Sequence, residues 1–290
     1  MRPVSILLSI ATLLSVLVAQ AVAAEPVQKN IEYARVGERV LALDLYSPDA
    51  KDPAPAIVWI HGGAWRSGSK DDVPVKRWIE SGFAIASVDY RLSPEAPFPA
   101  QAHDIKSAIR YLQAHARGLR IDPDRIVIAG SSAGAHLAAL VGVSNGVPEL
   151  EGSIGTPATK PAQVRAIVSF FGASNLQTIL SQSTEHGLSV RVPALKLLLG
   201  GSQDEKSDLA KLASPVAHVD ANDPPLWLIH GDADPQMPIE QSRELESKYR
   251  SAGRLVTFEV IVGGKHGGKE FFEDARLDRL AVALKSSLFP

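Results

Sequence analysis

The sequence predicts a single α/β domain with a mostly parallel central sheet and helices on both faces. Short continuous apolar runs of strand length recur along the chain, and segments with helical periodicity lie between them. Apolar runs without alternation are typical of strands buried from both sides, and strands that alternate with helices form parallel sheets through right-handed crossovers. Because no fixed-period repeat or low-complexity linker divides the pattern, we expect one domain over residues 25–290.

The first 23 residues are predicted to be a signal peptide. Arg2 precedes an apolar run from Val4 to Val18, and Ala21-Val22-Ala23 gives the small-x-small pattern that a signal peptidase needs. The run is shorter than the roughly 20 residues of a membrane span, which favours cleavage over anchoring. We therefore expect export, to a periplasm or to the outside, and no stable membrane insertion.

An antiparallel hairpin is expected next, at residues 31–36 and 39–46, because leucines alternate with polar or small residues after Gly37-Glu38. The buried strands are expected at 56–60, 83–88, 125–129, 164–171, 226–229 and 256–262. Helical periodicity predicts helices at 73–81, 102–116, 133–143, 239–252 and 269–288.

Two stretches interrupt this alternation, residues 144–163 and residues 174–222, and the second contains an apolar helical run at 192–199. The second stretch directly precedes the strand expected at 226–229. Ligands of open α/β sheets bind at the carboxyl edge of the sheet. The insertion 174–222 is therefore a candidate lid over that edge.

The predicted nucleophile is Ser132, in the string Gly130-Ser131-Ser132-Ala133-Gly134. An apolar strand runs directly into this string and a helix follows without a gap. A serine at such a sharp turn has a strained backbone and an exposed hydroxyl, and small neighbours are needed on both sides. Of the two serines, only Ser132 has glycine at both the −2 and the +2 position.

The predicted oxyanion hole lies in His61-Gly62-Gly63-Ala64-Trp65, at the end of an earlier apolar strand. An acyl-transfer serine needs hydrogen-bond donors where negative charge develops. We assign these donors as the backbone N–H groups of Gly63, Ala64 and Ala133. His61 and Trp65 are expected to brace the loop.

The predicted general base is His266, in a glycine-flanked loop after the last apolar strand. The order serine, acid, histidine is the one expected for a serine hydrolase of this type. His136 lies one helical turn after Ser132, but there we expect it to pack or to bond locally. His230 is expected to shape the loop that presents the acid, and polar or surface contacts are expected for His103, His115, His186 and His218.

Two aspartates follow the strand expected at 226–229, and both are candidates for the acid. Asp234 lies farther along the loop and can reach a neighbouring histidine loop, whereas Asp232 beside Gly231 suits a turn-stabilising role. The residues alone favour Asp234 and leave Asp232 open.

Together these motifs resemble the α/β-hydrolase superfamily, and within it the esterases with an HGGxW loop. The chain is similar to bacterial feruloyl and acetyl-xylan esterases and, more distantly, to the hormone-sensitive-lipase group. The motifs that carry the resemblance are 61–65, 89–93, 130–134, 230–234 with Pro238, and 266–267. The resemblance implies the triad Ser132, Asp234 and His266.

Two departures from the family pattern stand out. Ala64 replaces the third glycine of the lipase-group loop, and Lys265 stands where a small residue usually precedes the histidine. The resemblance implies structural ion pairs, not catalytic roles, for Asp89, Arg91 and Asp104.

Charge and composition exclude several functions. Lysine and arginine number 30 against 32 aspartates and glutamates, a net charge of −2, so the excess of positive charge typical of nucleic-acid binding is missing. The chain has no cysteine, which excludes disulfides, a cysteine nucleophile, a lipidated cysteine and thiolate metal sites. No HExxH motif is present, and we expect no metal and no organic cofactor.

The sequence therefore predicts a secreted serine carboxylic ester hydrolase that works through an acyl-enzyme, on short-chain or aromatic acyl esters. Its substrates are expected to be small molecules or esters linked to polysaccharides. Since a fold does not dictate the bond that is cleaved, a serine peptidase or an arylformamidase-like amidase is the alternative. A non-catalytic binding protein on the same scaffold is a third hypothesis.

Overall fold

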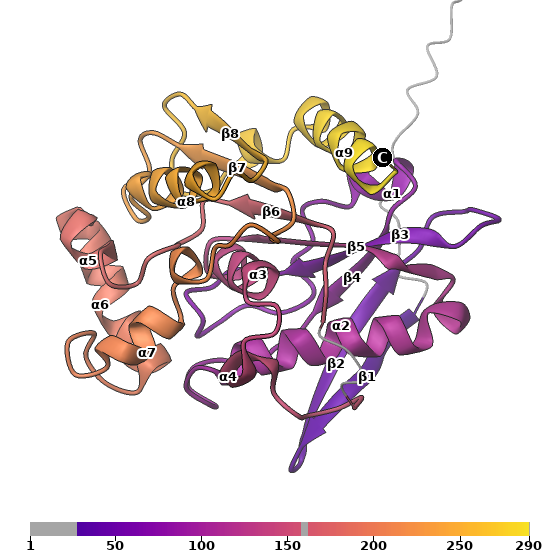
Figure 1. The fold of residues 1–290 in the computed structure, drawn as a ribbon, viewed down its shortest axis with the longest axis horizontal. Helices are drawn as coiled ribbons and strands as arrows, with labels where there is room; N and C mark the ends of the chain where they lie inside the picture. The colour runs from indigo at the N-terminus through magenta and orange to yellow at the C-terminus, as the bar shows by residue number, and fades with distance from the viewer. Residues whose placement is uncertain (1–27, 158–161, 290) are drawn as a thin grey trace, which may run out of the picture.

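The computed structural model describes residues 28–157 and 162–289. The predicted signal peptide at residues 1–23 lies outside the described residues. The described strands form one eight-stranded sheet with the order β1-β2-β4-β3-β5-β6-β7-β8 (Figure 1).

The sheet begins with the predicted hairpin. β1 (Gln28–Val36) pairs antiparallel with β2 (Arg39–Tyr46), and β2 pairs antiparallel with β4 (Ala84–Val88). All other neighbouring strands are parallel: β3 (Ala54–Ile60), β5 (Ile121–Ser131), β6 (Ala166–Phe170), β7 (Leu226–Gly231) and β8 (Val256–Ile261). The predicted fold class, a mostly parallel sheet with an N-terminal antiparallel hairpin, is confirmed.

Helices cover both faces of the sheet. On one face lie α1 (Arg77–Glu80) and α9 (Asp274–Leu288), and on the other lie α2 (Ala100–Leu119), α3 (Ala133–Val143) and α8 (Glu240–Ser251). Successive residues of β3 alternate between the two cores, because side chains of a strand point to opposite faces. Trp59 packs on the side of α1 and α9, and Ile60 packs on the side of α2 and α3.

Three expected elements differ in the structure. The helix predicted at 269–288 is broken into a short 3₁₀ turn, η2 (Lys269–Phe271), and α9, because Glu273 has an extended backbone with ψ of 139°. The helix predicted at 73–81 is reduced to α1. β8 is only partly buried, since it is an edge strand with a single partner, and the expectation that it is covered on both sides was wrong.

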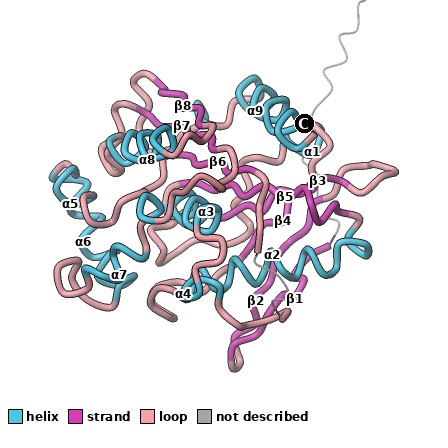
Figure 2. Tube along the Cα trace, in the orientation of Figure 1, coloured by secondary structure: helices cyan, strands magenta, loops and turns pink. Residues whose placement is uncertain are grey.

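The two interrupting stretches contain short helices. α4 (Pro148–Glu151) lies in the first, and the second holds α5 (Ile179–Gln182), α6 (Glu185–Leu199), α7 (Ser207–Leu212) and η1 (Pro215–Ala217). Figure 2 shows α5, α6 and α7 gathered at one end of the molecule. α6 starts at Thr184, whose hydroxyl accepts a 3.0 Å hydrogen bond from the Gly187 N–H, and it ends at Gly200 in a left-handed conformation.

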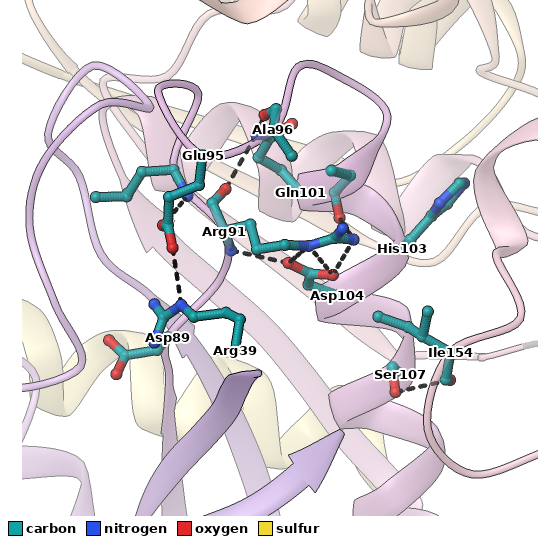
Figure 3. A network of polar contacts seen from close by, with 12 residues as sticks. Arg39, Asp89, Arg91, Glu95, Ala96, Gln101, His103, Asp104, Ser107 and Ile154 are labelled. Carbon is teal, nitrogen blue, oxygen red and sulfur yellow. Dashed lines mark hydrogen bonds and ion pairs between the residues drawn. The ribbon is translucent and has the colours of Figure 1, made fainter. Parts of the chain in front are cut away.

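A buried polar network holds the segment between β4 and α2 (Figure 3). The Arg91 side chain donates to Asp104, with a shortest distance of 2.6 Å, and the Arg91 backbone N–H donates to the same carboxylate. Gln101 donates to the Arg91 carbonyl. The ion pair expected for Arg91 and Asp104 is therefore present and structural.

Asp89 differs from this expectation, because among the described residues it forms no ion pair. Its carboxylate accepts from the Lys70 backbone N–H at 2.8 Å, and its carbonyl accepts from the Tyr33 hydroxyl at 2.6 Å. The Lys70 ammonium pairs instead with Asp44.

Across residues 28–157 and 162–289, no helix combines the length and the apolar character that crossing a bilayer requires.

Candidate active site

The predicted site residues all follow the ends of parallel strands. Ser132 follows β5, Asp234 follows β7, His266 follows β8, and the loop around Gly63 follows β3. The carboxyl ends of parallel strands meet at one edge of the sheet, where open α/β folds bind ligands. The topology therefore brings together residues that are far apart in the sequence.

Ser132 occupies a strained turn between β5 and α3. Its φ of 52° and ψ of −118° lie outside the usual regions for a residue with a side chain, at a cost of about 1–3 kcal/mol. An added Cβ at Gly130 would lie 2.5 Å from the Gly134 carbonyl oxygen, and one at Gly134 would lie 2.1 Å from the Ile60 carbonyl oxygen. The turn thus needs glycine at both flanking positions because the backbones pack directly on each other.

Ser132, His266 and Asp234 form a continuous chain of hydrogen bonds. Ser132 Oγ lies 2.9 Å from His266 Nε2, and His266 Nδ1 lies 2.7 Å from Asp234 Oδ2. With the proton on Nδ1 donated to the carboxylate, Nε2 is free to accept the serine hydroxyl proton. The three side chains are therefore arranged for transfer of a proton away from Ser132.

Asp234 is a fully enclosed carboxylate that stays ionised. Its Oδ1 accepts from the backbone N–H groups of Gln236 and Met237, both at 2.8 Å. Burial favours the protonated form, but hydrogen bonds with His230 and His266 hold the pKa of the Asp234 carboxyl well below its ordinary value. The charge needed to orient His266 is thus present throughout the neutral pH range.

Asp232, the acid that the residues alone left open, does not contact His266. Its carboxylate accepts from the Gly263 backbone N–H at 2.6 Å, and the Ala233 N–H donates to the Gly264 carbonyl at 3.0 Å. Asp232 therefore ties the acid loop to the histidine loop. The sequence suggested that Asp232 stabilises its own turn, whereas the hydrogen bond of its carboxylate goes to the neighbouring loop.

The three predicted oxyanion donors face no competing acceptor. Within the described part of the chain, the N–H groups of Gly63, Ala64 and Ala133 donate to no other group. Gly63 has a φ of 109°, and a Cβ there would lie 2.0 Å from the Ser67 carbonyl oxygen. Ala64 adopts a φ of 52°, so this loop is strained at the same edge as Ser132.

The residues beside this loop brace it, as expected. The His61 ring stacks on Tyr90 with centroids 4.5 Å apart, and the Trp65 Nε1–H donates to His136 Nδ1 at 3.1 Å. His136 Nε2 in turn donates to the Ala213 carbonyl, so both ring nitrogens are engaged. Burial lowers the pKa of His136 to about 4, and the ring is a neutral packing element.

The other histidines are also engaged or remote. His230 is buried and bonds with the Ser242 hydroxyl and the Met237 carbonyl, so it shapes the acid loop. The rings of three more histidines bond to backbone carbonyl oxygens: His103, His115 and His218. His186 is exposed.

A pocket of about 470 Å³ opens beside Ser132. It is lined by residues that the sequence did not single out, including Arg66, Phe171, Arg191 and Gln236. Phe171 meets the His266 ring edge to face, with centroids 5.0 Å apart. Phe171 is the last residue of the apolar strand expected at 164–171, which was a usable signal, whereas Arg191 lies in the insertion and carried none.

Among residues 28–157 and 162–289, no group of three or more histidines, aspartates and glutamates is arranged to hold a metal ion.

The chain is similar to several proteins named as esterases. Esterase LipQ of Mycobacterium tuberculosis is 32% identical over 81% of this chain, although the match spans only 55% of LipQ, so this chain covers about half of that relative. A truncated carbohydrate esterase from gut microbiota matches with a TM-score of 0.80 and 32% identity, covering 91% of this chain and 96% of the other. Thermogutta terrifontis esterase 2, phosphoramylated by tabun, matches with a TM-score of 0.74 and 29% identity, covering 90% and 96%.

The sequence model of the family described as BD-FAE matches residues 43–249, a segment that includes the loop around Gly63, the Ser132 turn and Asp234. With the identity to LipQ over most of the chain, this match shows that the chain belongs to the BD-FAE family of esterases with the α/β-hydrolase fold.

Proposed function

We propose that the protein is a carboxylic ester hydrolase in which Ser132, His266 and Asp234 act as a catalytic triad. The observation that carries the proposal is the unbroken chain of hydrogen bonds from the Ser132 hydroxyl through His266 to the ionised Asp234. The similarity to named esterases supports the same reaction.

In the proposed mechanism, Ser132 Oγ attacks the ester carbonyl while His266 Nε2 takes its proton. The N–H groups of Gly63, Ala64 and Ala133 stabilise the negative charge on the carbonyl oxygen. His266 then donates the proton to the leaving alcohol, which leaves an acyl group on Ser132. A water molecule, activated by His266, hydrolyses this acyl-enzyme and regenerates the serine.

The proposed substrates are esters of short-chain or aromatic acids, on small molecules or on polysaccharides. A pocket of about 470 Å³ accepts a small acyl group together with part of the alcohol. The similarity to a carbohydrate esterase supports a sugar-linked alcohol.

We also propose that the protein is exported, on the strength of the charged, apolar and small-residue segments at 1–23. Fractionation of cells that express the full chain tests this. Processed protein in the periplasm or the medium is expected, and unprocessed protein in the cytosol would contradict export.

Replacement of Ser132 tests the proposed reaction. Ser132→Ala is expected to lower the kcat for 4-nitrophenyl acetate by a factor on the order of 10⁴ to 10⁶, because the nucleophile is lost. Ser131→Ala, one residue earlier, is the matched control and should retain turnover. Wild-type activity in Ser132→Ala would refute the assignment.

A fluorophosphonate probe and a matched amide separate the alternatives stated from the sequence. Labelling of Ser132 is expected for a serine hydrolase and absent from a non-catalytic binding protein. A higher kcat/KM for the amide than for its matched ester would favour the amidase or peptidase over the esterase.

A further inference from the structure

The pocket beside Ser132 contains a buried cation that the proposed triad does not use. Arg191 lies on α6, in the insertion, and forms part of the pocket wall with only 1% of its surface exposed. Arg66, which follows the loop around Gly63, also lines the pocket and is exposed. Two guanidinium groups therefore border the space next to the nucleophile.

Arg191 is incompletely satisfied by the protein. Its Nε donates a long 3.4 Å hydrogen bond to the Gln236 carbonyl, and its guanidinium lies 5.9 Å from the centre of the Trp65 ring. Its Nη1 has no hydrogen-bond partner, and within the described residues no carboxylate lies within ion-pair distance of it. A buried charge without a charged partner destabilises the folded state, so such a group calls for an explanation.

The other buried cations of the described residues, Lys70, Lys106 and Arg110, have an acceptor at every side-chain nitrogen. Lys106 pairs with Glu151 and also donates to the Ser144 carbonyl, both at 2.6 Å. Arg110 donates to backbone carbonyls through all three of its nitrogens. Since these cations fulfil a structural role by satisfying their donors, the open donor on Arg191 sets it apart.

The charged groups around Arg191 do not neutralise its guanidinium. Asp234 attracts Arg191 but is already bonded to His266 and to backbone N–H groups, and Arg66 repels it. Asp72, which is exposed, is the acidic residue among those that line the pocket. Burial lowers the pKa of Arg191 to about 10, so the guanidinium stays charged at neutral pH.

We propose that Arg191 recognises a carboxylate on the ester substrate, close to the scissile bond, with the exposed Arg66 as an auxiliary cation. This inference rests on the proposed ester hydrolase function and narrows its substrate class. A guanidinium presents several N–H donors in one plane and matches a carboxylate better than any other cationic side chain does. A substrate carboxylate in the pocket would give the guanidinium a charged acceptor, where its single hydrogen bond now goes to the Gln236 carbonyl.

The carboxylate can belong to the acyl group or to the alcohol, and two substrate pairs distinguish these sources. For the acyl side, mono-4-nitrophenyl glutarate is compared with its neutral amide, 4-nitrophenyl glutaramate, after subtraction of spontaneous hydrolysis. For the alcohol side, 4-acetoxybenzoate is compared with 4-acetoxybenzamide. The measured quantity is the ratio of kcat/KM for the charged and the neutral member of each pair.

Three variants at Arg191 separate the effect of its charge from an effect on the folded structure. Arg191→Met removes the charge, Arg191→Gln keeps an N–H donor near the Gln236 carbonyl, and Arg191→Lys keeps the charge. In one of the two substrate pairs, Arg191→Met and Arg191→Gln are expected to lower the charged-to-neutral ratio about 10- to 100-fold, and Arg191→Lys is expected to lower it by less. Lys196→Met, an exposed change on the same helix, should leave both ratios unchanged.

An unchanged ratio in both pairs would overturn the proposal. So would equal losses on charged and neutral esters in Arg191→Met and Arg191→Gln, which would make Arg191 only a brace for the acid loop. Arg191→Lys and a thermal melt of each variant detect misfolding. If wild-type protein hydrolyses neutral esters and Ser132→Ala does not, the ester hydrolase stands whatever the ratios show.

Discussion

Cavities lie at both edges of the sheet, and one at the edge away from the triad is larger than the pocket beside Ser132. At the amino ends of β6, β7 and β8, a cavity of about 580 Å³ is bordered by Arg165, Asp223 and Arg254. The pocket at the carboxyl edge, beside Ser132, measures about 470 Å³. Size alone would favour the amino edge over the candidate site.

The edges differ in how their polar groups are satisfied. At the amino edge, Arg165 donates to the Asp124 carbonyl and Arg254 donates to the Asp223 carbonyl. At the carboxyl edge, backbone N–H groups and the Arg191 Nη1 have no acceptor among the described residues. The non-glycine residues with positive φ at this edge are Ala64, Trp65, Ser132 and Phe171. Backbone N–H groups without an acceptor and four strained residues close together, not volume, distinguish the candidate site.

The largest effect is expected from Asp234→Asn, which tests whether the carboxyl edge carries the chemistry. The amide cannot hold His266 in the tautomer with a free Nε2, so kcat should fall by about 10⁴-fold. Steady-state kinetics with 4-nitrophenyl acetate measure this. Asp278→Asn, an exposed aspartate paired with Arg77, is the control and should behave as wild type. A fall in kcat of less than tenfold in Asp234→Asn would contradict the proposal that the carboxyl edge carries the chemistry.

Gly63→Ala should have the next largest effect. The added Cβ would meet the Ser67 carbonyl oxygen at 2.0 Å, so the loop must shift and its N–H donors move away from the oxyanion. We expect kcat to fall about 10²- to 10³-fold. Gly118→Ala, where a Cβ meets nothing within 4 Å, should keep full activity. Wild-type kcat in Gly63→Ala would remove this loop from the catalytic site.

At the amino edge, Asp223→Asn should change stability and not activity. Burial raises the pKa of Asp223 to about 7, so the folded state holds a proton that the unfolded chain releases at lower pH. The free energy of unfolding therefore falls as the pH rises from about 4 to about 7. Asp223→Asn replaces the carboxyl with an amide that does not ionise, so the free energy of unfolding no longer falls. The variant should be more stable than wild type at pH 8 by on the order of 2 kcal/mol.

Urea denaturation at pH 4.5 and pH 8 measures this difference, with a small effect expected at the lower pH. An equal gain at both pH values would contradict the raised pKa of Asp223. Lower kcat/KM in Asp223→Asn would mean that the two edges are not independent.

The smallest effect is expected from Arg165→Met, the counterpart at the amino edge of Arg191→Met. The side chain is exposed and donates only to a backbone carbonyl, so kcat/KM for any ester should stay within about twofold of wild type. A selective loss of kcat/KM for charged esters in Arg165→Met would indicate that the larger cavity, and not the pocket beside Ser132, binds the anion.

The sequence by itself determined the fold class and predicted most of the residues of the candidate site. Strands buried on both faces show as continuous apolar runs, and the glycines around Ser132 and Gly63 are dictated by local backbone geometry. His266 was also predicted from its glycine-flanked loop. Such features depend on residues near each other in the chain, so the sequence displays them directly.

Only the tertiary structure decided the features that depend on distant segments. The tertiary structure places Asp234 beside His266, whereas the carboxylate of Asp232 accepts a hydrogen bond from the Gly263 N–H. The register of β7 and β8 decides this, because it sets which atoms of the two following loops meet. The tertiary structure broke the predicted C-terminal helix at Glu273. It also brought Arg191 from the insertion to the pocket wall, since no local pattern encodes which surface a long insertion packs against.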